Sequence, residues 1–154
     1  MEKIKYTERR KHKRYETRNQ AIAMVKSESG KLDCISKMSK GEVGMAVYKS
    51  RPHKLGQILN VGRGGLSFSY ISKKNQKNKV DEIDILLADD DFYLKNIQFK
   101  TILDASLEDD NNFSPLEMKT QSIKFINMTT RQSLKLEYFL KYHTKNYKSE
   151  TAFN

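Results

Sequence analysis

The sequence of 154 residues predicts a small, mainly β protein in which about six antiparallel strands form a barrel and a C-terminal α-helix closes one end. Three observations predict this fold class. Short apolar or alternating segments recur along the chain, with polar loops between them. One segment near the C-terminus has helical periodicity. The first 19 residues are polar and charged with little periodicity, which predicts a flexible basic N-terminal arm.

The first part of the barrel is predicted from three segments. Residues 21–25 read Ala-Ile-Ala-Met-Val, an apolar run typical of a buried strand. Residues 44–48 are a second strand candidate, and residues 54–60 are a third that leads into a glycine-rich corner. The stretch 31–43 between them is ambiguous and favours neither a helix nor a strand.

The remaining strands follow that corner. Leu66, Phe68 and Tyr70 alternate with serine residues, which is the clearest period-two pattern in the chain and indicates a half-buried strand. Three further strands are predicted at residues 83–87, 92–102 and 118–128, with polar connections at residues 73–79, 89–91 and 108–115.

The C-terminal helix has a clear start signal. Thr129 and Gln132 have the spacing of a capping box, in which each side chain bonds the other residue's free backbone amide. A broad apolar face is predicted to follow, formed by Leu134, Leu136, Tyr138, Phe139, Leu140 and Tyr142. The chain therefore divides into an arm (residues 1–19), a barrel with its closing helix (20–143) and a polar tail (144–154).

The composition favours a soluble, cytoplasmic protein. Cys34 is the single cysteine and cannot form an internal disulfide, which fits a reducing compartment. No apolar run approaches the roughly 20 residues that span a bilayer. The charged N-terminus lacks the apolar stretch of a signal peptide. Membrane insertion is not expected.

Charge is distributed unevenly along the chain, whose formal net charge is +10. Residues 1–14 contain seven lysines and arginines against two glutamates, whereas residues 81–110 contain ten acidic residues against two lysines. A basic arm indicates an anionic partner. The acidic middle argues mildly against a general nucleic-acid coat, which more often spreads positive charge over one whole face.

No pattern in the sequence predicts an enzyme. His12, His53 and His143 are scattered, and none lies near Cys34 or a pair of carboxylates in sequence. The acidic clusters of the chain lack the calcium-loop spacing with its glycine and terminal glutamate. We therefore expect neither catalysis, nor a metal, nor a cofactor.

Two short motifs carry the most information. The first is Arg10-Lys11-His12-Lys13-Arg14, and the second is the segment 60–65, Asn-Val-Gly-Arg-Gly-Gly. Taken alone, a basic arm is most often a solvated tail that binds anions without specificity, and a glycine-rich corner is most often a turn or a bulge. The second motif is not a phosphate loop, because no Lys-Ser or Lys-Thr pair follows its glycines.

Together, the motifs resemble those of the PilZ domain family of bacterial cyclic di-GMP receptors. That family has Arg-x-x-x-Arg on its arm and Asp/Asn-x-Ser-x-x-Gly between its second and third barrel strands. This chain matches the first motif fully and the second at two positions, with Gly62 where the family has serine. The segment 26–43 is longer than the family pattern, which suggests an inserted hairpin. The resemblance implies a dinucleotide site formed by Arg9, Arg10, Arg14, Asn60, Gly62, Arg63 and Gly65.

The residue types suit such a ligand. The planar fork of arginine pairs with phosphate oxygens and also with the O6 and N7 atoms of guanine. Asn60 offers an acceptor and donors to a base edge. Gly64 and Gly65 allow a tight turn and a close approach to the ligand. Arg63 adds a charge that compensates for the missing serine.

The resemblance implies a non-enzymatic receptor or adaptor, whose arm clamps cyclic di-GMP against the corner and changes the surface offered to a protein effector. Alanine at Arg10 or at Arg14 is expected to abolish binding, and Gly62→Ser is expected to tighten it. Two alternatives stay open. A degenerate PilZ-like interaction module without nucleotide is favoured by Gly62. A small-barrel RNA-binding protein requires exposed aromatics beside the arm, for which Tyr6 and Tyr15 are the candidates.

Overall fold

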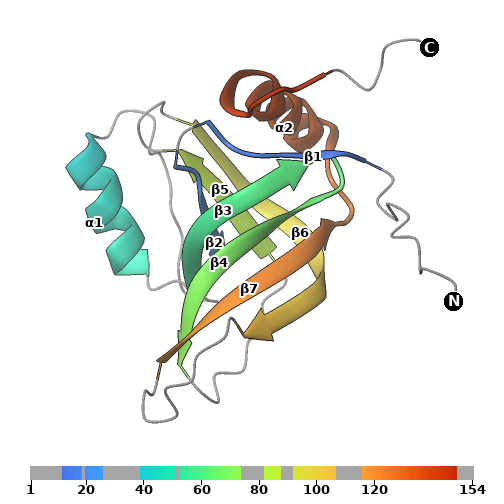
Figure 1. The fold of residues 1–154 in the computed structure, drawn as a ribbon. Helices are drawn as coiled ribbons and strands as arrows, with labels where there is room; N and C mark the ends of the chain where they lie inside the picture. Colours follow the sequence, from blue (N-terminus) through green and yellow to red (C-terminus); the bar gives the residue numbers. More distant parts are fainter. Residues whose placement is uncertain are drawn as a thin grey trace, which may run out of the picture.

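A computed structural model describes residues 12–18, 20–25, 39–50, 53–73, 82–87, 92–106 and 116–148 (Figure 1). Within these residues the chain forms seven strands and two helices. In chain order they are β1 (Arg14–Tyr15), β2 (Ile22–Val25), α1 (Lys40–Ser50), β3 (Lys54–Gly62), β4 (Gly65–Lys73), β5 (Glu82–Leu87), β6 (Phe92–Ser106), β7 (Leu116–Phe125) and α2 (Thr130–His143).

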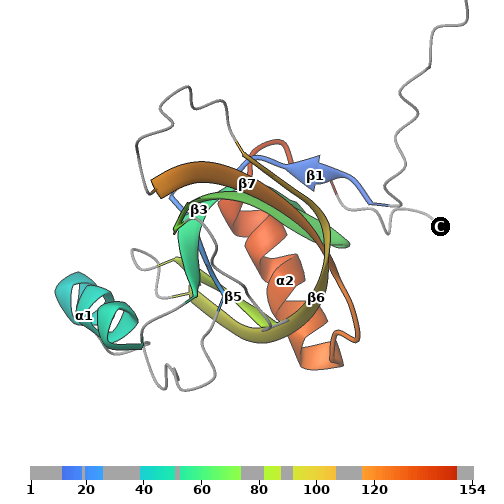
Figure 2. The same ribbon diagram turned by 90° about the horizontal axis from the view of Figure 1, so that it is seen from below.

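Six of the strands close into an antiparallel barrel. The order is β3-β2-β5-β6-β7-β4, and β4 pairs back with β3 to complete the ring. The short β1 is a seventh strand, which pairs with the end of β3. Seen from below, α2 lies within the curve of the sheet, whereas α1 stands outside it (Figure 2). The predicted fold class, a small mainly β barrel with a C-terminal helix, is confirmed.

The core fills the space between the barrel and α2. Leu66, Phe68 and Tyr70, which alternate along β4, are all buried, as their period-two pattern predicted. The facing side of α2 contributes Leu136 and Phe139 to the same apolar cluster. Burial of large apolar side chains at the barrel end is the main force that holds α2 in place.

The start of α2 is confirmed, but its predicted apolar face is only partly correct. Thr129 and Gln132 form both bonds of the capping box. The buried residues of the helix are Leu136, Phe139 and Leu140, whereas Leu134, Tyr138 and Tyr142 are exposed. The apolar residues therefore do not act as one face, because α2 buries a narrow stripe and presents a second apolar stripe outward.

The prediction of a strand at residues 44–48 was also wrong, because these residues lie in α1. Ser39 and Glu42 form a reciprocal capping pair at the start of this helix. Val43 and Val47, four residues apart, then face the barrel and pack in a cluster with Met24 of β2. A short apolar run is compatible with either period, and the contact with the sheet selects the helix.

The other predicted elements fall on strands, on α1 or outside the described residues. Of the hairpin suggested at residues 26–43, residues 26–38 lie outside the described residues, and residues 40–43 are the start of α1 and not a strand. Segments 21–25, 54–60, 83–87, 92–102 and 118–128 overlap β2, β3, β5, β6 and β7. The turn predicted at residues 89–91 and the loop at 108–115 lie outside the described residues.

A polar cluster lies at the end of β3 and β4 remote from their connecting turn. The hydroxyl of Tyr70 donates to the carboxylate of Asp104, with oxygen–oxygen distances of 2.7 and 2.9 Å. Lys54 Nζ donates to Gln121 Oε1 at 2.7 Å and lies 3.5 Å from Asp104 Oδ2. Burial of Tyr70, followed by its hydrogen bond to Asp104, raises the pKa of the phenol well above its ordinary value of 10.

This cluster predicts an alkaline loss of stability. In the unfolded chain Tyr70 ionises near pH 10, whereas in the folded protein it stays protonated to higher pH. The folded state then binds more protons, so the free energy of unfolding falls as pH rises above about 10. Tyr70→Phe is expected to reduce that fall, measured as the denaturant midpoint between pH 8 and 11.

The control for this prediction is Tyr142→Phe, which removes the hydroxyl of a tyrosine that is 51% exposed. That variant is expected to follow the wild-type pH profile. Burial lowers the pKa of Lys54, an effect of opposite sign that is common to all three proteins. An alkaline slope in Tyr70→Phe as steep as that of the wild type would contradict the assignment.

Candidate functional site

The two sequence motifs meet at one corner of the barrel. The β3–β4 hairpin turns through Arg63 and Gly64, and the strand β1 of the basic arm pairs with β3 just before that turn. In this pairing Arg14 lies opposite Gly62 and Tyr15 lies opposite Val61. The arm and the glycine corner are therefore adjacent, as the resemblance implied. Figure 1 shows β1 crossing beside the end of β3.

The side chain of Arg14 joins three strands at this corner. Its Nη1 donates to Ser67 Oγ at 2.8 Å and lies 3.4 Å from Asn60 Oδ1. Its Nη2 donates to the carbonyl oxygen of Ile123 at 3.1 Å. The guanidinium thus contacts β3, β4 and β7 together, and its planar fork suits this divergent set of acceptors.

Two serines of the site were missed by the sequence reasoning. Ser67 is only 5% exposed, and its Oγ lies 2.7 Å from Ser122 Oγ. The alternation of β4 could have indicated Ser67, because it puts this residue on the face opposite Leu66 and Phe68. Nothing in the sequence indicates Ser122, since its position opposite Ser67 depends on the β4–β7 register.

The glycines of the corner allow close approach of neighbouring backbone. A Cβ atom at Gly65 would lie 2.0 Å from the carbonyl oxygen of Ile123 and 2.8 Å from Arg14 Nη2. A Cβ atom at Gly62 would lie 2.1 Å from the carbonyl oxygen of Lys13. No glycine among the described residues has positive φ, so their use here is space and not a left-handed turn.

Gly62 is therefore required by the docked arm. A serine at this position has a Cβ atom, which would overlap the backbone carbonyl oxygen of Lys13 in the present arrangement. The hydroxyl could be gained only if β1 moved away from β3. The expectation that Gly62→Ser tightens ligand binding is thus opposed by the geometry.

Arg63 is held by α2 and the segment that follows it. Its Nε forms an ion pair with Glu137, and its Nη2 lies 3.5 Å from the hydroxyl oxygen of Tyr147. The hydroxyl of Tyr147 also donates to Glu137. Hydrogen bonding to Glu137 raises the pKa of the Arg63 guanidinium, which stays charged. Arg63 can therefore contact a ligand only if its guanidinium also keeps its bond to Glu137 or gives that bond up.

The arm is also fastened to the segment after α2. The backbone amide of Lys145 donates to the carbonyl oxygen of Glu16 at 2.8 Å, and Arg18 Nε donates to Thr144 O at 2.8 Å. The ring of Tyr15 packs edge-on against that of Tyr147, with centroids 5.2 Å apart. We name residues 144–148 the clasp segment. The residues around β1 thus lie between the corner and the clasp segment.

The predicted site residues have different outcomes. Arg14, Asn60 and Gly65 come together, Gly62 contacts the arm, and Arg63 pairs with α2. Arg9 and Arg10 lie outside the described residues. Tyr15, a candidate stacking platform for RNA, is buried, so it does not offer an exposed ring, and Tyr6 lies outside the described residues.

The described residues offer neither a metal site nor a membrane-spanning helix. No cluster of three or more histidine, cysteine or carboxylate side chains there could hold a metal ion. Neither helix in that part of the chain is long and apolar enough to cross a membrane.

Solved structures identify the fold. One similar structure is described as the PilZ domain with c-di-GMP of YcgR from Escherichia coli. It has 10% sequence identity to this chain and a TM-score of 0.52, and the match covers 86% of this chain and 92% of that one. The chain has a PilZ-like fold. No protein-family model and no curated protein sequence matches it.

A second PilZ-like match is MrkH, described as a novel c-di-GMP dependence transcription regulatory factor. Its identity is 13% and its TM-score is 0.52, with 86% of this chain covered. This chain spans half of MrkH, since 50% of that chain is matched. In this PilZ-like barrel, the Arg14–Asn60 corner is formed by the two segments that resemble the family motifs.

Proposed function

We propose that this protein is a non-enzymatic receptor or adaptor for cyclic di-GMP. Arg10 and Arg14 clamp the dinucleotide against the corner formed by residues 60–65. The observation that carries the proposal is the reach of Arg14 from the arm to Asn60 and Ser67. The PilZ-like fold supports it, because both similar structures are described in terms of c-di-GMP. No metal or cofactor is part of the proposal.

The chemistry of Arg14 suits capture of a phosphate. Three of the acceptors that hold its guanidinium, on Asn60, Ser67 and Ile123, are neutral oxygens. With an anionic phosphate both partners of the arginine bond are charged and the pairing is frequently bidentate, whereas these acceptors are neutral and diverge onto three residues. A dinucleotide phosphate or a guanine edge can therefore compete for the fork of Arg14. Arg10 joins the same ligand from four residues earlier in the chain.

The output of binding is a change in the arm and the clasp segment. Ligand that draws Arg14 out of its contacts also acts on the β1–β3 pairing opposite Gly62. The arm is bonded to the clasp segment through Glu16 and Arg18. A shift of β1 thus alters the surface that the clasp segment offers to a protein effector, by differential affinity of the ligand for the two arrangements.

The first test is calorimetric titration of the purified protein with cyclic di-GMP, with GTP and cyclic di-AMP as controls. We expect saturable binding of cyclic di-GMP with micromolar or better affinity, and no comparable heat from either control. Selectivity against cyclic di-AMP is expected because arginine pairs with the O6 and N7 atoms of guanine, which adenine does not present in the same pattern. GTP has a single guanine, so it offers the site only half of the base contacts of cyclic di-GMP. The absence of any binding heat with cyclic di-GMP at millimolar concentration would contradict the proposal that the protein is a receptor for this ligand.

A titration without binding heat would favour the second candidate function, a PilZ-like interaction module without nucleotide binding. The specific observation in its favour is Gly62, which lacks the serine hydroxyl of the family motif and instead accommodates Lys13 O. The RNA-binding alternative is weaker, because the buried Tyr15 packs against Tyr147 and does not stack on an exposed base. Its test is a steep salt dependence with long single strands.

A further inference from the structure

The outward face of α2 carries an exposed apolar stripe. Leu134 is 67% exposed, Tyr138 is 54% exposed and Tyr142 is 51% exposed. These residues are four positions apart, so they lie in a row along one face of the helix. The core contact of α2 uses its other face, and in this row Tyr138 stacks on Phe92 at the edge of the core. Large apolar side chains gathered on a surface commonly mark an interaction site.

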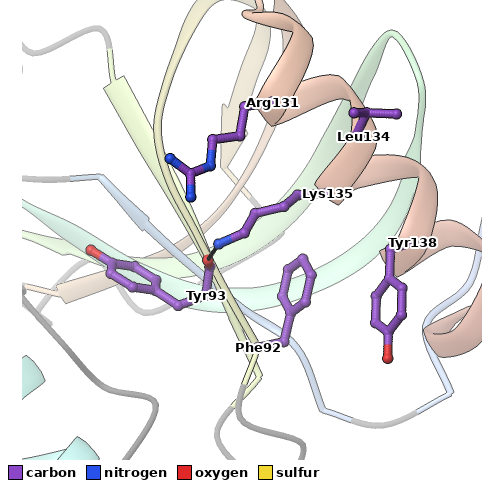
Figure 3. Close-up of a pocket in the computed structure, with 6 residues that line it drawn as sticks. All are labelled: Phe92, Tyr93, Arg131, Leu134, Lys135 and Tyr138. Carbon is purple, nitrogen blue, oxygen red and sulfur yellow. Dashed lines mark hydrogen bonds between the residues drawn. The ribbon is translucent and has the colours of Figure 1, made fainter.

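The stripe borders an open groove between α2 and the start of β6. The groove has a volume of about 370 Å³ and is lined by Phe92, Tyr93, Arg131, Leu134, Lys135 and Tyr138 (Figure 3). The rings of Phe92 and Tyr138 are nearly parallel, with centroids 6.4 Å apart. Phe92 is 8% exposed and also packs against Phe139 of the core, so the base of the groove is firmly held.

The charge of this surface is positive. In Figure 3 the side chains of Arg131 and Lys135 extend from α2 across the groove toward β6. Among the described residues Arg131 has no hydrogen-bond or ion-pair partner, and Lys135 Nζ donates to a neutral group, the carbonyl oxygen of Tyr93, at 3.1 Å. The one carboxylate of α2, on Glu137, is bound to Arg63 on another side of the helix.

We propose that this groove binds a short acidic segment of a partner protein, with an apolar side chain entering between Leu134 and Tyr138. Carboxylates of the segment pair with Arg131 and Lys135, which supply the charge complementarity. From Arg131 to Tyr142 the helix rises about 16 Å at about 1.5 Å per residue, which matches about five residues of extended chain. The proposal is independent of dinucleotide binding.

A nucleic acid is a poorer fit to the same surface. Nucleic-acid sites track the phosphate backbone with a dense line of cations. Here two cations flank a row whose most exposed member is Leu134, which neither stacks on a base nor bonds a phosphate. An alternative occupant of the groove from the same chain is the acidic run Asp89-Asp90-Asp91, which directly precedes Phe92 in sequence.

The test uses a fluorescein-labelled peptide, Asp-Glu-Leu-Phe-Glu-Asp, and measures its polarisation with the full-length protein. A peptide of the same apolar centre but basic ends, Lys-Arg-Leu-Phe-Lys-Arg, is the charge control. The acidic peptide is expected to bind and the basic one not. Arg131→Ala and Lys135→Ala are each expected to weaken binding about two- to fivefold, as for exposed ion pairs.

A matched variant separates the groove from general positive charge. Lys49→Ala removes one exposed lysine from α1 and is expected to leave the affinity unchanged. Leu134→Ser, at a site that contributes nothing to the core, is expected to weaken binding at least threefold while the circular dichroism spectrum stays the same. Loss of affinity in Lys49→Ala equal to that in Arg131→Ala would overturn the proposal.

Three further outcomes would also overturn it. One is equal binding of the basic peptide. Another is displacement of the acidic peptide by a single-stranded oligonucleotide whose own binding requires Arg131 and Lys135, which would assign the groove to nucleic acid. The last is binding only after Asp89, Asp90 and Asp91 are all changed to asparagine. That result would assign the groove to the chain's own acidic run.

Discussion

Replacing Arg14 with alanine is expected to abolish measurable cyclic di-GMP binding, with a loss of about 100-fold or more. A hydrogen bond to a charged group contributes about 1.5–3 kcal/mol, and the fork of Arg14 can donate two to one ligand. Each 1.4 kcal/mol corresponds to about a factor of ten in affinity. Calorimetric titration of the variant beside the wild type measures this loss directly.

The matched control for Arg14→Ala is Lys13→Ala, which removes the same charge from the adjacent, exposed residue. Its affinity is expected to fall no more than about threefold, because an exposed charge contributes little at physiological salt. Arg14→Lys keeps the charge but not the planar fork, and an intermediate affinity is expected. Near-normal affinity in Arg14→Ala would contradict the clamp, whatever Lys13→Ala does.

Replacing Gly62 with serine is expected to weaken cyclic di-GMP binding at least tenfold and to lower the melting temperature. The added Cβ would lie 2.1 Å from Lys13 O, a backbone atom that can yield only if β1 shifts. Such overpacking costs about 1–3 kcal/mol, and each kcal/mol lowers the melting temperature of a chain of this size by about 2–4 °C. Displacing β1 also moves Arg14, which pairs with this position.

Gly64→Ser is the control within the same turn. A Cβ at Gly64 would meet first the side chain of His12, at 3.3 Å, which can rotate aside. This variant is therefore expected to keep the stability and affinity of the wild type within experimental error. Tighter binding by Gly62→Ser would show that the family serine still fits this corner and that β1 yields without cost. Calorimetry and thermal unfolding of both variants decide the matter.

The fold was largely predictable because most elements bury one clear face. The alternation of Leu66, Phe68 and Tyr70 has a single period, and all three side chains are buried in the barrel. The capping box of Thr129 and Gln132 is a local signal that needs no tertiary partner. The run at residues 44–48 was too short to separate helix from strand, and packing of α1 against the sheet selects the helix.

The site was predictable only in its principal residues. The resemblance of the two motifs to those of the PilZ family indicated Arg14 and Asn60, which do approach each other. The serine hydroxyls beside the Arg14 guanidinium were not predictable, because Ser67 and Ser122 meet only through the β4–β7 register. The pairing of Arg63 with Glu137 links residues 74 positions apart, and no local pattern records such a contact.

The sequence by itself determined most of the strands, the capped helix α2 and the two short motifs of the corner, since these depend on residue types at short, fixed spacings. The tertiary structure decided the use of each residue. It made Gly62 a point of contact for the arm, directed Arg63 toward α2 and left Leu134 exposed beside the groove. The physical reason is that steric overlap, ion pairing and burial depend on distances between distant segments, which only the closed barrel sets.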